Sequence, residues 1–256
     1  MLSSYSINNK ELIKVPVRFN FRRALTDNDR GWKVGEKMKI WQDAGLCYTV
    51  QQFQIISSDK DKTVIKGEYT FTDSKATATI EHSIFANGTI EIDYNISIPQ
   101  DLPNIPRIGL QFEIEKELQN IDWYGRGPHE NYIDRESGAA IGIYQTTLDQ
   151  WTTPYVRPQE NSNRGGIRWL RFSQGTHQLQ FSAVGEPFCA SAWPYTISTL
   201  EQTTHDFELK MHNNIIVDID CNQMGVGGDC SWGLPVLQKY QIKPGKYQYK
   251  FIISAK

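Results

Sequence analysis

Residues 76–98 read ATATIEHSIFANGTIEIDYNISI, and this stretch decides the fold. Apolar residues alternate with polar ones through residues 76–84 and again through residues 90–98, on either side of Asn87-Gly88. A two-residue period is the pattern of a half-buried β-strand, and Asn-Gly tolerates the positive φ of a tight turn. The stretch therefore predicts a β-hairpin with one face in a core.

The same alternation continues outward from this hairpin. It predicts strands at residues 63–71 and 108–114, a second hairpin over residues 207–219, and a last strand at residues 247–251 after the Pro244-Gly245 turn. Strands of about nine residues span roughly 30 Å at about 3.3 Å per residue. Such lengths favour broad sheets over the short strands of an immunoglobulin-like module.

Helical patterns are scarce. We expect at most one short helix, over residues 198–204, where Ser198 and Glu201 have the spacing of a capping box. Because long amphipathic helices do not alternate with the strands, a (β/α)8 barrel and a doubly wound sheet are both excluded. The segment 123–168 is rich in Gly, Pro and Asn and predicts long loops. We therefore predict an all-β fold, with residues 1–256 forming a single domain.

Composition narrows the classes of partner. The formal charge of −2 gives no basic field for nucleic acid. No stretch is apolar for the roughly 20 residues that a membrane span needs, and residues 1–14 lack the pattern of a signal peptide. The cysteines are widely spaced without a CxxC pair, so we expect neither disulfides nor zinc, but mostly buried thiols. They are Cys47, Cys189, Cys221 and Cys230.

Five sequence runs, in order along nearly the whole chain, resemble the C-terminal domain of glycoside hydrolase family 2 β-galactosidases, also called the fifth or small-chain domain. They are RFNFRRALTDNDRGW at 18–32, PRIGL at 106–110, WYGRGPHENYIDR at 123–135, TPYVRPQENSNR at 153–164 and MGVGGDCSW at 224–232. The resemblance implies a supersandwich of two large antiparallel sheets, like that of galactose mutarotases. One departure lies at residues 21–25, where FRRAL stands in place of the family's usual Phe-Trp-Arg-Ala-Pro.

The resemblance also implies a substrate-binding residue, Trp232. In the family, the Trp of the Gly-Gly-Asp-x-Ser-Trp motif reaches into the pocket of the catalytic barrel and forms an apolar platform for the sugar. Such a platform is physically reasonable, because a pyranose has an apolar C–H face that can lie on an indole. Residues Gly227, Gly228, Asp229 and Ser231 complete the motif here and are expected to shape the site.

A second site-shaping segment is implied at residues 27–31. Asp27, Asn28, Asp29 and Gly31 look at first like a calcium loop, but Gly31 stands at the fifth position, where a ligand belongs. We expect a loop rich in Asx turns, and no metal site. By resemblance, this loop lies near the mouth of the active site. The run Gly225–Gly228 is likewise expected to form a turn and not a phosphate cradle, because no helical pattern follows it.

A polar cluster around residue 130 invites a catalytic interpretation. Neighbouring residues of an extended chain point to opposite sides, so His129 and Glu130 are poorly placed to act on one atom. We expect these residues to tie loops together through Arg–carboxylate hydrogen bonds. The set with expected structural roles is His129, Glu130, Asn131, Asp134, Arg135, Arg157, Glu160, Asn161 and Arg164.

No catalytic residue is expected in this chain. Retaining hydrolysis of a β-galactoside needs two carboxyl groups about 5 Å apart, and in the family both come from a barrel that this sequence lacks. The resemblance therefore implies a non-catalytic domain, or a separate small subunit, that is inactive on lactose alone. It implies the rest of a β-galactosidase and a galactoside as partners, a homo-oligomeric full enzyme, and any Mg or Na bound outside this domain. The cellular compartment, cytoplasmic or periplasmic, stays open.

Two alternatives belong to other classes of function. In the first alternative, the chain is an aldose mutarotase or epimerase, with a histidine acid and a carboxylate base on the same scaffold. The available histidines are His82, His129, His177, His205 and His212. In the second, it is a stand-alone carbohydrate-binding module that uses exposed aromatic residues, of which the sequence supplies 7 Trp, 12 Tyr and 11 Phe.

Overall fold

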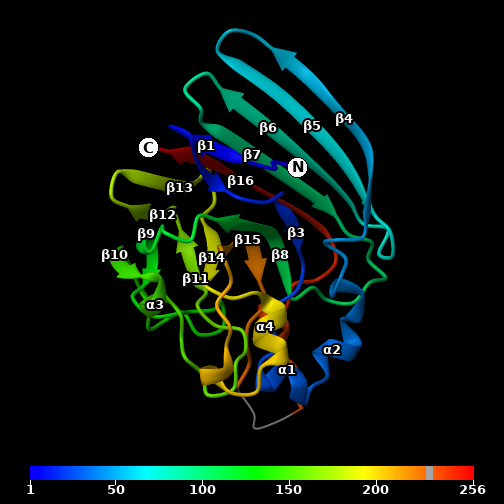
Figure 1. The fold of residues 1–256 in the computed structure, drawn as a ribbon. Coiled ribbons are helices and arrows are strands. Elements are labelled where there is room, and N and C mark those ends of the chain that lie inside the picture. The colour runs from blue at the N-terminus through cyan, green and yellow to red at the C-terminus, as the bar shows by residue number, and fades with distance from the viewer. Residues whose placement is uncertain (229–232) are drawn as a thin grey trace.

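The computed structural model describes residues 1–228 and 233–256, which form two antiparallel β-sheets packed against each other (Figure 1). The larger sheet has nine strands in the order β10-β9-β12-β13-β16-β7-β6-β5-β4. Their bounds are β10 Ala140–Thr147, β9 Asn120–Gly127, β12 Trp169–Gln174, β13 His177–Ala183, β16 Lys246–Ala255, β7 Ile90–Ser97, β6 Thr77–Phe85, β5 Lys62–Phe71 and β4 Tyr48–Ser58.

The smaller sheet has seven strands in the order β1-β2-β8-β15-β14-β11, with β3 also hydrogen-bonded to β8. Their bounds are β1 Tyr5–Ile7, β2 Lys10–Ile13, β3 Arg18–Asn20, β8 Arg107–Ile114, β11 Arg164–Ile167, β14 Phe188–Trp193 and β15 Ile215–Gln223. Two large antiparallel sheets confirm the predicted all-β sandwich.

The main core lies between the sheets. Phe112 of the smaller sheet meets Phe181 and Phe251 of the larger one, with ring centroids 5.0 and 6.1 Å apart. At the β4 end, Phe19 packs edge-on against Tyr48, Tyr69 and Phe71. These contacts join the two layers, because Phe19 belongs to β3 and its three partners belong to β4 and β5.

The predicted hairpin at residues 76–98 is confirmed. Strands β6 and β7 pair with Ala78 opposite Ile96 and Ile84 opposite Ile90, so that the alternating apolar residues share one face. Gly88 has a φ of +83°, which is the left-handed conformation that the Asn-Gly turn was expected to need.

The predicted hairpin over residues 207–219 is wrong in its first half. Strand β15 forms, but it pairs with β8 and β14. Residues Asp206–Glu208 form a 3-10 turn instead, and Phe207 and Met211 are 83% and 76% exposed. The alternation at Phe207, Leu209 and Met211 therefore does not mark a buried strand face.

Short helices are more numerous than the single one predicted. The described residues contain α1 Asp27–Gly31, α2 Val34–Lys37, α3 Leu148–Trp151 and α4 Ile197–Gln202, with 3-10 turns at Lys39–Trp41, Asp206–Glu208 and Gln238–Tyr240. Helix α4 is the predicted one, but Thr196 caps it by accepting from the Thr199 N–H, in place of the expected Ser198. Helices this short depend on capping and packing, so hydrophobic periodicity does not reveal them.

None of the described helices has the length and apolar character that crossing a membrane requires.

The thiols were expected to be mostly buried, and Cys47 differs because it is exposed. Cys189 and Cys221 are partly buried. Burial raises the pKa of both Cys189 and Cys221 to about 12. Cys230 lies outside the described residues.

We predict that Phe19→Ala lowers the free energy of unfolding by about 3–5 kcal/mol, because Phe19 is 3% exposed and fills the space between the sheets. Urea unfolding followed by tryptophan fluorescence measures the change. Phe207→Ala is the matched control, since Phe207 is 83% exposed and its loss should change stability by no more than about 0.5 kcal/mol. Equal losses in the two variants would contradict the assigned core.

Candidate functional site

The two segments implied to shape the site lie side by side in the fold. Arg23 donates from Nη1 to the Met224 carbonyl at 2.6 Å and from Nη2 to the Gly225 carbonyl at 2.9 Å. Asn28 donates to the Val226 carbonyl at 2.9 Å. Segments about 200 residues apart in sequence are thus held together by side-chain hydrogen bonds to backbone carbonyls.

Residues 27–31 form helix α1, which corrects the expected loop of Asx turns. Thr26 caps the helix by accepting from the Asp29 N–H at 3.0 Å, and the Asp29 carboxylate accepts from the Thr26 N–H at 3.1 Å. Asp29 is fully buried and also accepts from Nε and Nη2 of Arg23, at 3.0 and 2.8 Å. The acidic residues therefore serve the capping box and one buried ion pair, and in the described residues no cluster of His, Cys, Asp or Glu is arranged to hold a metal.

The glycine run forms a loop whose shape depends on two kinds of constraint. A Cβ on Gly225 would lie 2.5 Å from the Asp134 Oδ2 atom, so there is no room for a side chain. The same Oδ2 accepts from the Gly227 N–H at 2.7 Å. Gly227 and Gly228 have φ values of +74° and +115°, which glycine adopts without strain. Asp134, which was expected only to tie loops together, thus holds the loop that leads to residue 229.

Asp229, Cys230, Ser231 and Trp232 lie outside the described residues, and the predictions for Asp229, Ser231 and Trp232 fall there. Their described neighbours both face α1. The position of a Cβ on Gly228 is 3.9 Å from the Asn28 side-chain nitrogen, and that of a Cβ on Gly233 is 3.7 Å from the Gly31 carbonyl oxygen. Helix α1 therefore lies near the chain on each side of this segment.

Behind this site lies a buried ionic cluster that the sequence analysis missed. Arg107 of β8 lies between Asp218 and Asp220 of β15 and Glu160 of a loop, and all four side chains are fully buried. Its Nη2 is 3.0 Å from Glu160 Oε1, and its Nε is 3.1 Å from Asp220 Oδ2 without the alignment of a hydrogen bond. The run PRIGL, recognised only by resemblance, thus carries the central cation of the cluster.

The position of Asp220 in this cluster explains why residue 109 is a glycine. Gly109 stands opposite Asp220 in the sheet, and a Cβ there would lie 1.9 Å from Asp220 Oδ1. Burial raises the pKa of Asp220 well above its ordinary value; Arg107 opposes the shift, while Asp218 and Glu160 add to it. Neither Asp220 oxygen has a hydrogen-bond partner among the described residues, so burial of the charged form is only partly compensated.

The residues expected to tie loops together make such contacts. Glu130 accepts hydrogen bonds from Arg135 and Tyr155, and from the Ser162 N–H at 2.7 Å. Arg164 donates to the Trp151 and Ser162 carbonyls, both at 2.8 Å, while its guanidinium lies 4.1 Å from the Trp151 ring centre.

Three further members of that set connect the loops with each other and with α1. Asn161 accepts from the Thr153 N–H at 3.3 Å. The side chain of Asn131 accepts from the Gly165 N–H at 2.9 Å. Arg157 lies 3.5 Å from Asp27, which connects these loops to α1.

The histidines are distributed over the molecule. His212 lies 2.9 Å from Glu113, and His205 lies 3.5 Å from Glu208. His82 is buried on β6, and burial lowers its pKa to about 4, so it is neutral near pH 7. The His212 ring and the Glu113 carboxylate thus hydrogen-bond each other.

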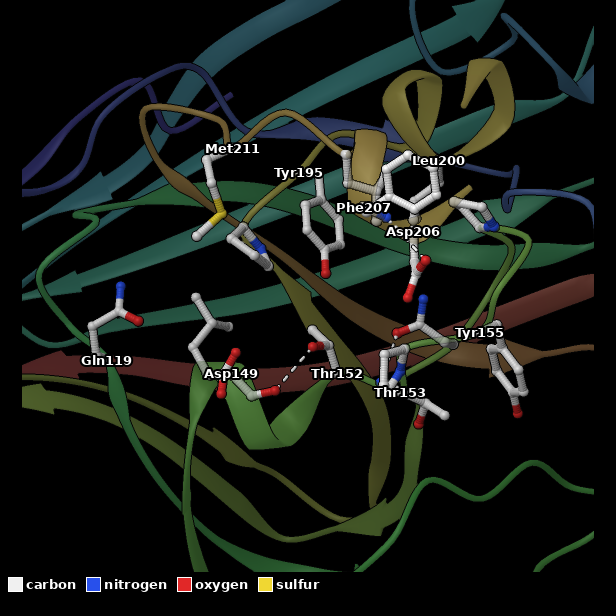
Figure 2. Close-up of a pocket in the computed structure, with 16 residues that line it drawn as sticks. Gln119, Asp149, Thr152, Thr153, Tyr155, Tyr195, Leu200, Asp206, Phe207 and Met211 are labelled. Carbon is white, nitrogen blue, oxygen red and sulfur yellow. Dashed lines mark hydrogen bonds between the residues drawn. The ribbon is translucent and has the colours of Figure 1, made fainter. Parts of the chain in front are cut away.

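A separate pocket of about 310 Å³ lies between α3, α4 and the loop after α4. Figure 2 shows the Tyr195 hydroxyl directed into this pocket, between the side chains of Asp206 and Asp149. Apolar side chains, among them Phe207 and Met211, also line the pocket. Sequence patterns do not reveal this pocket, because its residues come from four separate segments.

Known proteins similar to this chain share one description. The family described as Beta galactosidase small chain matches residues 1–253. The β-galactosidase of Priestia megaterium is 34% identical over 93% of this chain, and that of Lactobacillus delbrueckii subsp. bulgaricus is 35% identical over 93%. The β-galactosidase of Streptococcus thermophilus is 33% identical over 99% of this chain.

The chain spans about a quarter of the length of these relatives, between 23% and 25%. Among solved structures, a putative aldose 1-epimerase of Escherichia coli K12 is similar with a TM-score of 0.42 and 10% identity, covering 99% of this chain and 79% of that chain. A similarity at this level supports no inference about activity.

We predict that Asp220→Asn changes how stability depends on pH. A carboxyl whose pKa is raised by folding stabilises the protein most at acid pH, and this contribution is lost as the pH rises through the raised pKa. The free energy of unfolding of Asp220→Asn, relative to that of the natural protein, should therefore increase with pH, by up to about 1.4 kcal/mol per pH unit. Urea unfolding between pH 4 and 8 measures it, with the exposed Asp101→Asn as control. A difference that stays constant with pH would show that folding does not raise the pKa of Asp220.

Proposed function

We propose that this chain, which belongs to the β-galactosidase small-chain family, completes the galactoside-binding site of a catalytic barrel and does not itself break the glycosidic bond. The observation that carries the proposal is the set of side-chain hydrogen bonds that hold the loop before residues 229–232. Arg23, Asn28 and Asp134 make these bonds, and Gly31 lies near Gly233, the residue after the segment. A loop fixed in this way can present a side chain at a defined position.

Trp232 is the side chain that we propose to be presented. An indole face is a suitable surface for the C–H face of a galactose ring, while the sugar hydroxyls bind polar groups elsewhere. Asp27, Asn28, Asp29, Gly31, Gly227, Gly228, Asp229 and Ser231 are proposed to shape the site around it.

Four acidic residues around this loop are fully buried, which supports the proposal. Asp29 is bound by Arg23, and Asp218, Asp220 and Glu160 surround Arg107 with fully buried side chains. A substrate cannot reach a fully buried carboxyl group. Asp134 accepts from the Gly227 N–H, so it is held by the loop. The acid/base and the nucleophile of a retaining hydrolase are therefore proposed to come from another part of the enzyme.

The remaining partners follow from this proposal. The relatives are about four times as long as this chain, which leaves room for a catalytic barrel in the rest of their length. We propose residues 1–256 as one domain of such an enzyme, or its small subunit, acting on terminal β-galactosides within a homo-oligomer. Any Mg or Na is proposed to bind outside this domain.

We predict that the purified chain alone shows no turnover of a chromogenic β-galactoside. Mixing it with a β-galactosidase catalytic chain that lacks this domain should restore turnover, because the sugar site is then complete. Trp232→Ala should lower the restored kcat/KM by about ten-fold, which equals ~1.4 kcal/mol of lost contact with the sugar. The assay is a steady-state rate with saturating amounts of this chain.

Trp169→Ala is the matched control for that assay, since Trp169 is a partly exposed tryptophan on β12. It should restore turnover as well as the natural chain does. Turnover by the chain alone would overturn the proposal, because it would require a carboxyl pair within these residues. Equal losses from the two tryptophan substitutions would overturn the platform.

The pocket at Tyr195 favours a second candidate function, binding of a free sugar. Its volume of about 310 Å³ is at the lower end for small-molecule sites, and it combines aromatic rings with the carboxylates of Asp149 and Asp206. Aromatic rings beside carboxylates suit the apolar face and the hydroxyls of a pyranose.

Calorimetric titration with galactose separates the two candidates. Under our proposal a completing domain binds free galactose weakly, and we expect no saturation below ~10 mM, which corresponds to less than about 3 kcal/mol of binding free energy. Binding in the micromolar range that Tyr195→Ala abolishes, and that Trp232→Ala leaves intact, would instead support a stand-alone sugar-binding function.

A further inference from the structure

Strand β4 is an edge strand without the usual protection. It runs for 11 residues at one end of the larger sheet, and ten of them, from Thr49 to Ser58, are exposed. Its sequence, YTVQQFQIISS, contains no charged residue and no proline. Edge strands of soluble proteins are normally protected by charges, proline or a covering segment, because their free N–H and C=O groups bind other strands. The composition of β4 therefore favours a covered edge.

The apolar side chains of β4 continue the core face of the sheet. In the register, Val50 stands opposite Tyr69 and Phe53 stands opposite Gly67. Residues opposite each other in an antiparallel pair point to the same face, and Tyr69 points into the core. Ile55, opposite Ile65, belongs to the same face.

These side chains lie beyond the part of the face that the smaller sheet covers. Tyr48, at the start of β4, packs against Phe19 with ring centroids 5.2 Å apart. Val50, Phe53 and Ile55 are 55%, 56% and 65% exposed. We call these three residues the β4 face. An apolar face that leads out of the core and ends at an unpaired edge has the features of an interaction surface.

The position of Met1 indicates what lies against the β4 face. The Met1 amino group is 3.4 Å from the Tyr69 hydroxyl on β5, the strand next to β4 (Figure 1). The relatives carry this domain at their C-terminal end and are about four times as long. In them, the polypeptide before this domain therefore enters the fold beside the strand that neighbours β4.

We propose that the β4 face and edge bind an apolar, extended segment of the β-galactosidase polypeptide outside this domain, which adds a strand to the larger sheet. The segment's backbone hydrogen-bonds to β4, and its apolar side chains cover Val50, Phe53 and Ile55. This inference rests on the proposed function, because it assumes that the chain assembles with the rest of a β-galactosidase. It goes further by naming the surface and the kind of contact.

The opposite edge of the same sheet supplies a matched control. Strand β10 also lacks charged residues, and its Ile143 is 73% exposed. Ile143 stands opposite Tyr124 in the register, while the neighbouring Trp123 is buried in the core, so Ile143 is on the outer face. A substitution there changes an exposed edge isoleucine without changing the β4 face.

The test measures binding of this chain to a Streptococcus thermophilus β-galactosidase truncated to lack this domain, by calorimetry. The double substitution Phe53→Lys/Ile55→Lys should weaken binding at least about ten-fold, because two charges would be buried against an apolar segment. Ile143→Lys should change it by less than about two-fold. Hydrogen exchange should show that the β4 amides become protected in the complex, while circular dichroism confirms that each variant is folded.

Each other outcome has a definite meaning. Unchanged affinity of the double variant, or β4 amides that stay unprotected, would overturn the β4 docking and leave the proposed function intact. Self-association of the chain that the double variant abolishes would assign the face to a second copy and also overturn it. Loss of binding in the double variant, together with wild-type turnover by Trp232→Ala in the mixed enzyme, would support the docking and overturn the Trp232 platform. No binding at all by the natural chain would overturn both.

Discussion

The structure depends on one buried cation, Arg107. Its guanidinium has three carboxylate neighbours, Asp218 and Asp220 on the adjacent strand β15 and Glu160 from a distant loop. Removing a charge from water is costly, and removing one partner of a buried cluster leaves that cost without compensation. Arg107 therefore ties the smaller sheet to the loop that carries Glu160.

The ionic cluster also connects the core to the candidate site. Glu160 accepts a hydrogen bond at 2.8 Å from Gln223, the last residue of β15, and Met224 and Gly225 follow directly. The carbonyl oxygens of these two residues accept from Arg23. The glycine loop is thus fixed at its base by the strand that carries the cluster, and along its length by α1. Hydrogen bonds therefore restrain the backbone of residues 224–227 at several points.

Much of the fold follows from local sequence patterns, and the failures have physical causes. The β6–β7 hairpin was predictable because alternation and an Asn-Gly turn agree. The alternation at Phe207 and Met211 failed because a two-residue period shows which side chains share a face and not whether anything covers that face. Strand β4 was not predicted, since its polar residues are uncharged and its two register shifts break the period. Residues 48–58 are a strand because they pair with β5.

The site was predictable only where its residues form contiguous motifs. Resemblance drew attention to residues 27–31 and 224–232, and the structure brings the described parts of both together. The contributions of Arg23 and Asp134 could not be read from periodicity, because each acts on a backbone group far away in sequence. The ionic cluster was missed for a related reason, since Asp218 and Asp220 resemble the polar positions of an ordinary half-exposed strand.

The hydrogen bond from Arg23 to Met224 joins residues 201 positions apart. During synthesis, Arg23 is made about 200 residues before the carbonyl groups that it binds. Contacts of such long range form late and slowly. Any part of the sandwich that assembles earlier must therefore do so with the site's own framework unfinished. A polypeptide that stops before residue 224 therefore cannot form the glycine loop or the contacts that Arg23 makes with it.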